Sequence, residues 1–100
     1  MPAERVRSDF DKLKSIAGQF NSAAETTNGM IQSLNSNLEQ LRGRDWVGKG
    51  ADKFTGEMDN SVMPSLKRLQ RAMSNASRIT NQIAKIMKQA EDDAAGCFRS

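Results

Sequence analysis

Few residues of this chain have side chains that could carry out chemistry. Cys97 is the only thiol and the sequence has no histidine, so the Cys–His pair of a thiol nucleophile cannot form. The carboxylates at positions 91–93 are adjacent and would point in different directions on a helix, which argues against a metal site. Lys49 lies between two glycines, but no phosphate-binding Gly-Lys-Ser/Thr sequence is present. We therefore expect no catalytic, cofactor-binding or metal-binding residue and no enzymatic activity.

The composition fits one soluble domain with a thin core. The 100 residues are 37% hydrophobic and 5% aromatic, with a net charge of +3. A chain this small and polar gains burial by association. No apolar run reaches the ~20 residues of a membrane-spanning helix, and no general secretory signal is visible, which alone predicts a cytoplasmic protein without a transmembrane segment. Cys97 allows no internal disulfide, and we expect it in a mobile C-terminal tail.

The second half of the chain contains a long stretch without acidic residues. No aspartate or glutamate lies between Asp59 and Glu91. The basic residues in that interval are Lys67, Arg68, Arg71, Arg78, Lys85 and Lys88. We interpret them as a solvated helix face, with nucleic-acid binding as the alternative. A steep salt dependence of DNA binding would support that alternative.

Two long apolar stripes with helical spacing flank the centre of the chain. Steps that alternate between four and three residues indicate helices and exclude strands. The first stripe comprises Val6, Phe10, Leu13, Ala17, Phe20, Ala24, Thr27, Ile31, Leu34, Leu38 and Leu41. The second comprises Ala51, Phe54, Met58, Val62, Leu66, Leu69, Met73, Ala76, Thr80, Ile83, Met87 and Ala90. The sequence predicts an all-α antiparallel two-helix hairpin as a single domain, with helices at about 4–42 and 49–93, a turn at about 43–48 and a mobile tail to residue 100.

The turn and the second helix contain residues that constrain the backbone. Gly43 suits a left-handed cap at the end of the first helix, and Asp45 suits the N-cap of the second. Pro64 lies where the second stripe advances by four residues three times, between Phe54 and Leu66. Since regular spacing then resumes, we expect a kink at this proline rather than a break into two helices.

The apolar surface is wider than two packed helices need. Folding the chain back at Trp46 would place Ala17 opposite Ala76 in the inner seam. Further apolar residues each lie one position before an inner residue and widen the face to one side: Ile16, Ala23, Met30, Ala72, Ile79 and Ile86. Because a contiguous apolar edge usually marks an interface, we predict that two hairpins dimerise there into a four-helix bundle. The alternative is that these side chains pack within one hairpin.

The sequence Trp46-Val47-Gly48 lies almost at the midpoint of the chain, and Ala51 and Phe54 follow it. This turn between two helices resembles that of the WXG-100, or ESAT-like, family of small type VII secretion proteins. The resemblance implies a homodimer or a heterodimer with a homologous hairpin chain. It implies secretion from the cytoplasm without a cleaved signal peptide, recognition by an FtsK/SpoIIIE-type ATPase, and no small-molecule substrate. Trp46 would either anchor the open end of the hairpin or belong to a recognition surface.

One part of the family pattern is missing. Many exported members carry a C-terminal tyrosine followed four residues later by an acid, and this chain has no tyrosine. Met87 and Glu91 have that spacing and are the candidate export tail. We therefore expect a partner, or the dimer as a whole, to complete the signal. Two other functions compete: a self-assembling hairpin subunit of another secretion apparatus, and a basic nucleic-acid-binding hairpin.

Overall fold

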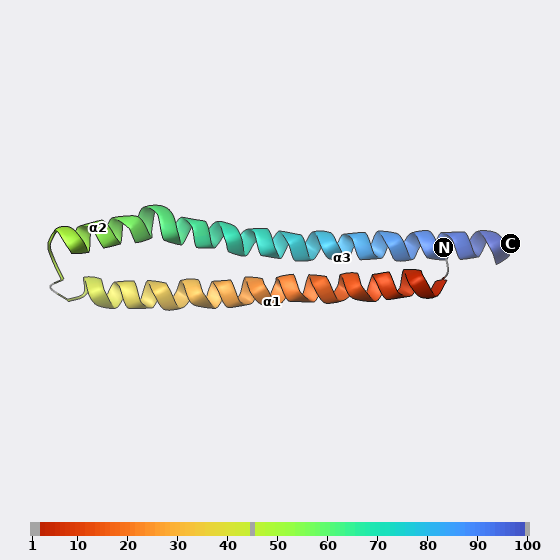
Figure 1. The fold of residues 1–100 in the computed structure, drawn as a ribbon, viewed down its shortest axis with the longest axis horizontal. Helices are drawn as coiled ribbons and strands as arrows, with labels where there is room; N and C mark the ends of the chain where they lie inside the picture. Colours follow the sequence, from red (N-terminus) through yellow and green to blue (C-terminus); the bar gives the residue numbers. More distant parts are fainter. Residues whose placement is uncertain (1–2, 45, 100) are drawn as a thin grey trace. The chain divides into compact units, whose positions relative to one another are not determined.

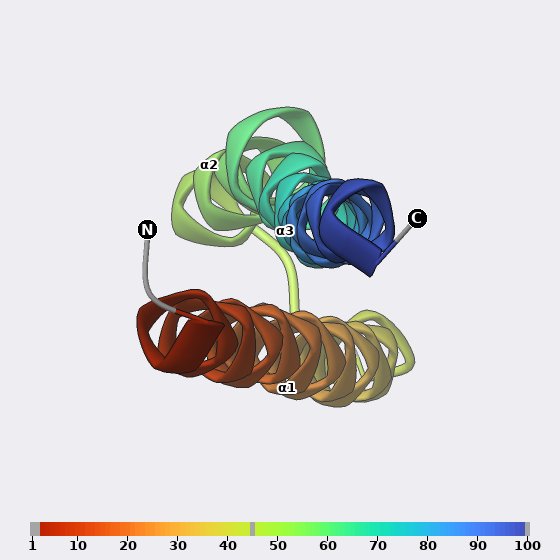
Figure 2. The same ribbon diagram turned by 90° about the vertical axis from the view of Figure 1, so that its right-hand side faces the viewer.

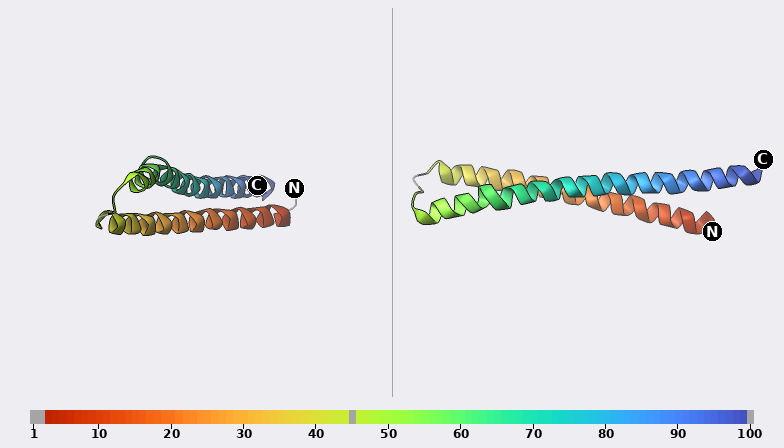
Figure 3. Two further views of the ribbon diagram at one scale, coloured as in Figure 1. Left: turned by 60° about the vertical axis from the view of Figure 1, so that its left-hand side comes forward. Right: turned by 90° about the horizontal axis from the view of Figure 1, so that it is seen from above.

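The computed structural model describes residues 3–44 and 46–99, with side chains from 4 to 97. In chain order its elements are α1 (Ala3–Arg42), α2 (Lys49–Glu57), a short π-helix η1 (Met58–Val62) and α3 (Met63–Arg99) (Figure 1). No strand occurs among these described residues. A turn joins α1 to α2 and reverses the chain (Figure 3). The predicted all-α hairpin is confirmed, whereas its dimerisation stays a prediction.

The chain divides into two compact units. One, which we call the turn unit, comprises residues 23–72, and the other, the end unit, comprises residues 1–22 and 73–100. We call α1 the first arm, and α2, η1 and α3 together the returning or second arm. In each unit a segment of the first arm lies antiparallel beside a segment of the returning arm. Figure 2 looks at the end unit along its helices and shows α1 beside α3 as a single pair. A pair of helices buries only one side of each, so much of every helix surface stays exposed.

Large apolar side chains form the core of the turn unit. Ile31 and Leu38 of α1 and Met63 of α3 are buried together. Leu34, Met58 and Leu66 are partly buried against them. The buried α1 residues are those of the predicted first stripe, which is confirmed in this unit.

Small side chains form the core of the end unit. Ala17 is 1% exposed and Ala84 is 0% exposed, and Ser77 is also buried. The Ser77 hydroxyl donates a hydrogen bond of 2.8 Å to the Ala17 carbonyl oxygen, so the two helices approach closely. The predicted pairing of Ala17 with Ala76 is therefore wrong by one residue.

The π-helix explains this shift of one residue. Pro64 has no N–H with which to continue the α-helical bonding, and the Met63 N–H donates to the Met58 carbonyl, five residues back. The arm remains helical through η1, so the chain does not break into two separate helices at this proline, as predicted. A π-helical turn holds an extra residue, which rotates everything after it. As a result Met63, Ser77 and Ala84 are buried, whereas the predicted Val62 and Ile83 are 38% and 45% exposed.

Two predicted helix ends are also corrected. The predicted end near residue 93 is too early, because α3 continues to Arg99. Ala94 and Ala95 favour helix, and Gln89 Nε2 donates to Asp93 Oδ1 at 2.9 Å across one turn. Gly43 does not adopt the predicted left-handed conformation, since Gly48 is the only positive-φ residue in the described part of the chain. Gly48 is also the N-cap of α2. The predicted cap, Asp45, lies outside the described residues.

Candidate interaction surfaces

The central turn presents aromatic and apolar side chains at the surface. The Trp46 N–H of the backbone donates to the Arg44 carbonyl at 2.7 Å and tightens the turn. The Trp46 and Phe54 rings meet edge to face, with centroids 5.6 Å apart. Trp46 is nevertheless 40% exposed and Val47 is 83% exposed. The indole thus packs on α2 and is accessible to a partner, so both predicted roles of Trp46 fit this geometry.

The other residues of the turn motif have distinct structural roles. Gly48 has φ 116° and ψ 175°, a conformation that side chains rarely allow, and its carbonyl accepts the first α2 hydrogen bond from the Asp52 N–H at 3.0 Å. Ala51 is buried at 6% exposure, where a small residue lets α2 begin close to its neighbours. The conformation of Gly48 and the burial of Ala51 account for two positions of the motif in physical terms.

A groove of about 450 Å³ lies beside this turn within the turn unit. Trp46, Ala51 and Thr55 line it, together with Asp52, Gly56, Asn60 and an ion pair. In that pair Arg42 Nη2 lies 2.6 Å from Asp59 Oδ1 and 2.7 Å from Asp59 Oδ2. Arg42 ends α1 and Asp59 belongs to η1, so the pair is a solvent-exposed contact between these two elements.

An exposed apolar face runs along the end unit. The predicted interface residues Ile16, Ile79 and Ile86 are 42%, 47% and 68% exposed. Ile83, which sequence reasoning placed inside, is 45% exposed between them. Ile16 and Ile83 also line one shallow groove, together with Leu13, Met87, Asp9 and Lys12. The structure thus brings these isoleucines to one side of the helix pair, and we call them the isoleucine face.

The turn unit has its own exposed apolar residues. Among the predicted interface residues there, Met30 is 48% exposed, Ala72 is exposed and Ala23 is half-buried. Leu69, predicted for the core, is 45% exposed because it follows the π-helix. Each unit therefore leaves apolar surface uncovered. None of the six predicted interface residues is fully buried.

The candidate export tail is part of α3. Met87 and Glu91 are half-buried, and they line a small cleft of the end unit with Val6, Ala90 and Ala94. Cys97 is exposed on the same helix, rather than in an irregular tail as expected. The candidate export tail is therefore a surface of the helix α3 and not an irregular segment.

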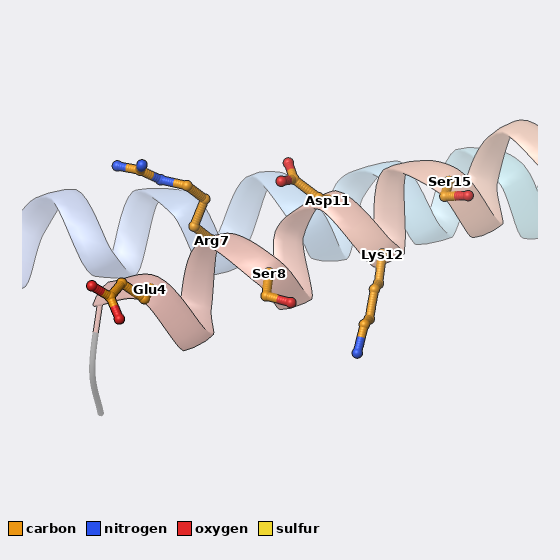
Figure 4. Close-up of a pocket in the computed structure, with 6 residues that line it drawn as sticks. All are labelled: Glu4, Arg7, Ser8, Asp11, Lys12 and Ser15. Atoms are coloured by element: carbon orange, nitrogen blue, oxygen red, sulfur yellow. The ribbon is translucent and has the colours of Figure 1, made fainter.

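One depression of the end unit is lined by α1 alone and has no features of a reactive site. Its lining residues are Glu4, Arg7, Ser8, Asp11, Lys12 and Ser15. Figure 4 shows Lys12 pointing away from Arg7 and Asp11, so these side chains do not converge. In the described part of the chain no group of histidine, cysteine, aspartate and glutamate could hold a metal ion. Among the described helices, none combines the length and hydrophobicity needed to cross a membrane.

Sequence reasoning missed the polar interactions between the arms, among them the Ser77–Ala17 hydrogen bond and two interactions of charged side chains. One is the Arg42–Asp59 ion pair, and the other places Lys88 Nζ 5.7 Å from the centroid of the Phe10 ring. Both depend on the register between the arms, and the π-helix alters that register. Pro64 and the irregular spacing of the second stripe were the available signals. They indicated an irregular helix near Pro64, but not how far the following residues are rotated around the helix axis.

Comparison with known proteins agrees with the central turn motif. Residues 5–92 match the family WXG100, described as proteins of 100 residues with WXG. The comparisons found no match among curated proteins and none among solved structures. Members of the matching family are secreted, non-enzymatic helical proteins associated with type VII secretion. Since the match covers most of the chain and includes the Trp46 turn, this protein belongs to the WXG100 family.

Proposed function

We propose that this protein is a type VII secretion partner that pairs with a second helical hairpin, either an identical chain or a homologue. The isoleucine face of the end unit carries the proposal. Full burial of one such side chain stabilises an assembly by about 1.5–3 kcal/mol. Four isoleucines that are 42% to 68% exposed can therefore contribute several kcal/mol, about half of the sum for four full burials, toward the cost of pairing. Within the turn unit, Met30, Leu69 and Ala72 are further exposed apolar residues available to a partner.

Light scattering tests the pairing. The chain has a mass of 11.0 kDa, so a closed pair has twice that mass and a polymerising subunit gives a far larger one. We expect the mass of a pair in a dilute sample, and Ile79→Asp should shift it to the monomer because a charge would be buried. Ser74→Asp, an exposed position on the same helix, is the matched control and should leave the mass unchanged. A well-folded wild-type monomer at low micromolar concentration would contradict the proposal.

A heterologous partner gives a different result in the same experiment. In that case the isolated chain should be partly molten, and its helical signal should sharpen when the homologous hairpin is added. Co-expression with neighbouring reading frames, followed by measurement of the mass of the purified complex, identifies that partner.

For export, we propose that an FtsK/SpoIIIE-type ATPase recognises the assembled pair. The accessible indole of Trp46 and the exposed Val47 support the turn as one contact. Met87 and Glu91 support a second contact on α3, although the usual tyrosine is missing. A partner that carries a tyrosine in this position would complete the signal.

Truncation after Ala90 tests the export proposal. The truncated chain keeps the cores of both units, since the last buried residue is Ala84. We expect pairing to persist and secretion to fail, measured in cells that express no other family member. If the full chain is secreted in these cells, equal secretion of the truncated chain would show that the segment after Ala90 carries no signal. If neither chain is secreted alone, the same comparison is made with the tyrosine-bearing partner co-expressed.

A further inference from the structure

We propose that the end unit binds the phosphodiester backbone of duplex nucleic acid through Lys14, Arg78, Lys85 and Lys88, which we call the basic patch. The proposal concerns a surface other than the isoleucine face and does not rest on the pairing function. It assigns a ligand class to three cations of the acid-free stretch at positions 60–90 and to Lys14, which the fold places beside them.

A hydrogen bond across the helix pair brings the basic patch together. Lys14 Nζ of α1 donates to Asn81 Oδ1 of α3 at 2.8 Å. Arg78 lies three residues before Asn81 and Lys85 four residues after it, so both share its side of α3. Lys88 follows Lys85 by three residues and lies over the Phe10 ring of α1. The four cations therefore lie along one side of the α1–α3 pair.

Positive charge predominates around Lys14, Arg78 and Lys85, and acidic residues border the patch only at its Lys88 end, where Asp11, Glu91 and Asp92 line the same depression as Lys88. No acidic residue occurs on α1 between Asp11 and Glu25 or on the returning arm between Asp59 and Glu91. The bond from Lys14 to Asn81 is to a neutral amide and does not neutralise the ammonium charge. All four cations are exposed. Such a cluster attracts a ligand with several closely spaced negative charges.

The arrangement favours a duplex over a lipid bilayer. Helices that lie on a bilayer bury apolar side chains next to their cations. Here Lys85 and Ile83 are two positions apart, which is about 200° around an α-helix, so one flat surface cannot contact both. The basic patch also stays accessible when a partner covers the isoleucine face.

The arrangement also favours a duplex over single strands. Binding of single strands relies on exposed aromatic rings on which bases stack. The one ring at the basic patch, Phe10, is half-buried with Lys88 over it. Arg78 and Lys85 are one heptad apart, about 10 Å along the helix, and polar residues such as Asn81 and Gln82 lie between them. These cations and polar side chains can contact phosphates but do not read base edges, so binding should not depend on the sequence of the nucleic acid.

Fluorescence anisotropy of a labelled mixed-sequence DNA duplex tests the proposal with the full chain. If four phosphates are neutralised, affinity should fall about 100-fold between 50 and 200 mM salt. The variant with Lys14→Gln, Arg78→Gln, Lys85→Gln and Lys88→Gln should bind at least about tenfold more weakly at low salt and lose most of the salt slope. The single variant Lys85→Gln, at an exposed position, should lose about one unit of that slope and serves if the quadruple variant unfolds.

A matched control separates the basic patch from net charge. The variant with Arg5→Gln, Lys12→Gln, Lys49→Gln and Lys53→Gln removes the same number of cations elsewhere and should bind within about twofold of wild type. Equal losses in the two quadruple variants would overturn the proposal, as would absence of duplex binding at low salt. Binding to vesicles of anionic lipid without binding to the duplex would overturn it as well.

Discussion

The two units hold the same pair of arms together in different ways. In the turn unit, Ile31, Leu38 and Met63 are buried, and their large side chains fill the space between the arms. In the end unit, the buried side chains are Ala17, Ser77 and Ala84, and a hydroxyl reaches across to a backbone carbonyl. Of the large apolar side chains of the end unit, the four isoleucines are exposed and Phe10, Leu13, Met73 and Met87 are half-buried. The turn unit thus buries large apolar side chains, which the end unit does not, although both units also expose large apolar side chains.

Because of this difference, the two units depend on different sources of stability. Large buried side chains contribute more hydrophobic free energy than alanines, so the turn unit depends chiefly on its own packing. The end unit buries little apolar area by itself and gains more from a partner that covers the isoleucine face. Subunit exchange and local opening should therefore begin in the end unit, which hydrogen exchange of its amides can measure.

The largest expected effect is loss of the turn-unit core. Leu38→Ala removes a buried side chain and should lower the free energy of unfolding by about 2–5 kcal/mol, because a cavity remains. Urea denaturation measures the loss, and Val47→Ala, at 83% exposure, is the control with an effect within about 0.5 kcal/mol. Equal loss of amide protection in both units would show that they do not differ in their source of stability.

The second effect tests the close approach of helices in the end unit. Ala84→Leu adds a large side chain at a position with 0% exposure and should cost about 1–3 kcal/mol through overpacking. Ala90→Leu places the same side chain at an exposed position of α3 and should be nearly neutral. If Ala84→Leu melts with the wild type, the arms are not closely packed there.

The sequence was most informative where helix geometry is regular. Ala17, Ile31 and Leu38 follow from the heptad spacing of the first arm, because an uninterrupted α-helix keeps its phase. After Pro64 the predicted second stripe is only partly right. Leu66, Met73, Ala76, Thr80 and Met87 are half-buried, whereas Leu69 and Ile83 are exposed and Ser77 and Ala84 are the buried residues. A stripe of apolar residues shows how a helix is patterned, but it cannot show how far a π-helical turn rotates the following residues.

The candidate surfaces were predictable to a similar degree. Ile16, Ile79 and Ile86 were placed on an exposed edge because the apolar stripe is broader than one seam requires. Ile83 was missed for the same reason that Ala84 was missed, namely the rotation after η1. The basic patch needed the register between the arms, since Lys14 and Asn81 are 67 positions apart in sequence.

A smaller effect should follow from the backbone of the turn. Gly48→Val forces a β-branched residue into φ 116° and should cost about 1–2 kcal/mol, although open space surrounds the added carbon. Gly50→Ala, two residues later within α2, has the same open space without positive φ and should be neutral or stabilising by up to about 1 kcal/mol. Thermal unfolding compares the two variants. Equal losses would show that the conformation of Gly48 is not the cause.

The smallest effect should come from the ion pair of the turn unit. Arg42 and Asp59 approach within 2.6 Å, yet their side chains are 44% and 50% exposed, so solvent screens their attraction. Asp59→Asn should cost less than about 1 kcal/mol, and a double-mutant cycle with Arg42→Gln should give a coupling that shrinks as salt is added. A coupling above about 2 kcal/mol that persists in high salt would instead make this pair, and not the apolar core, the feature that fastens η1 to α1. The contrast between the units would then lie in electrostatics at the turn rather than in the size of the buried side chains.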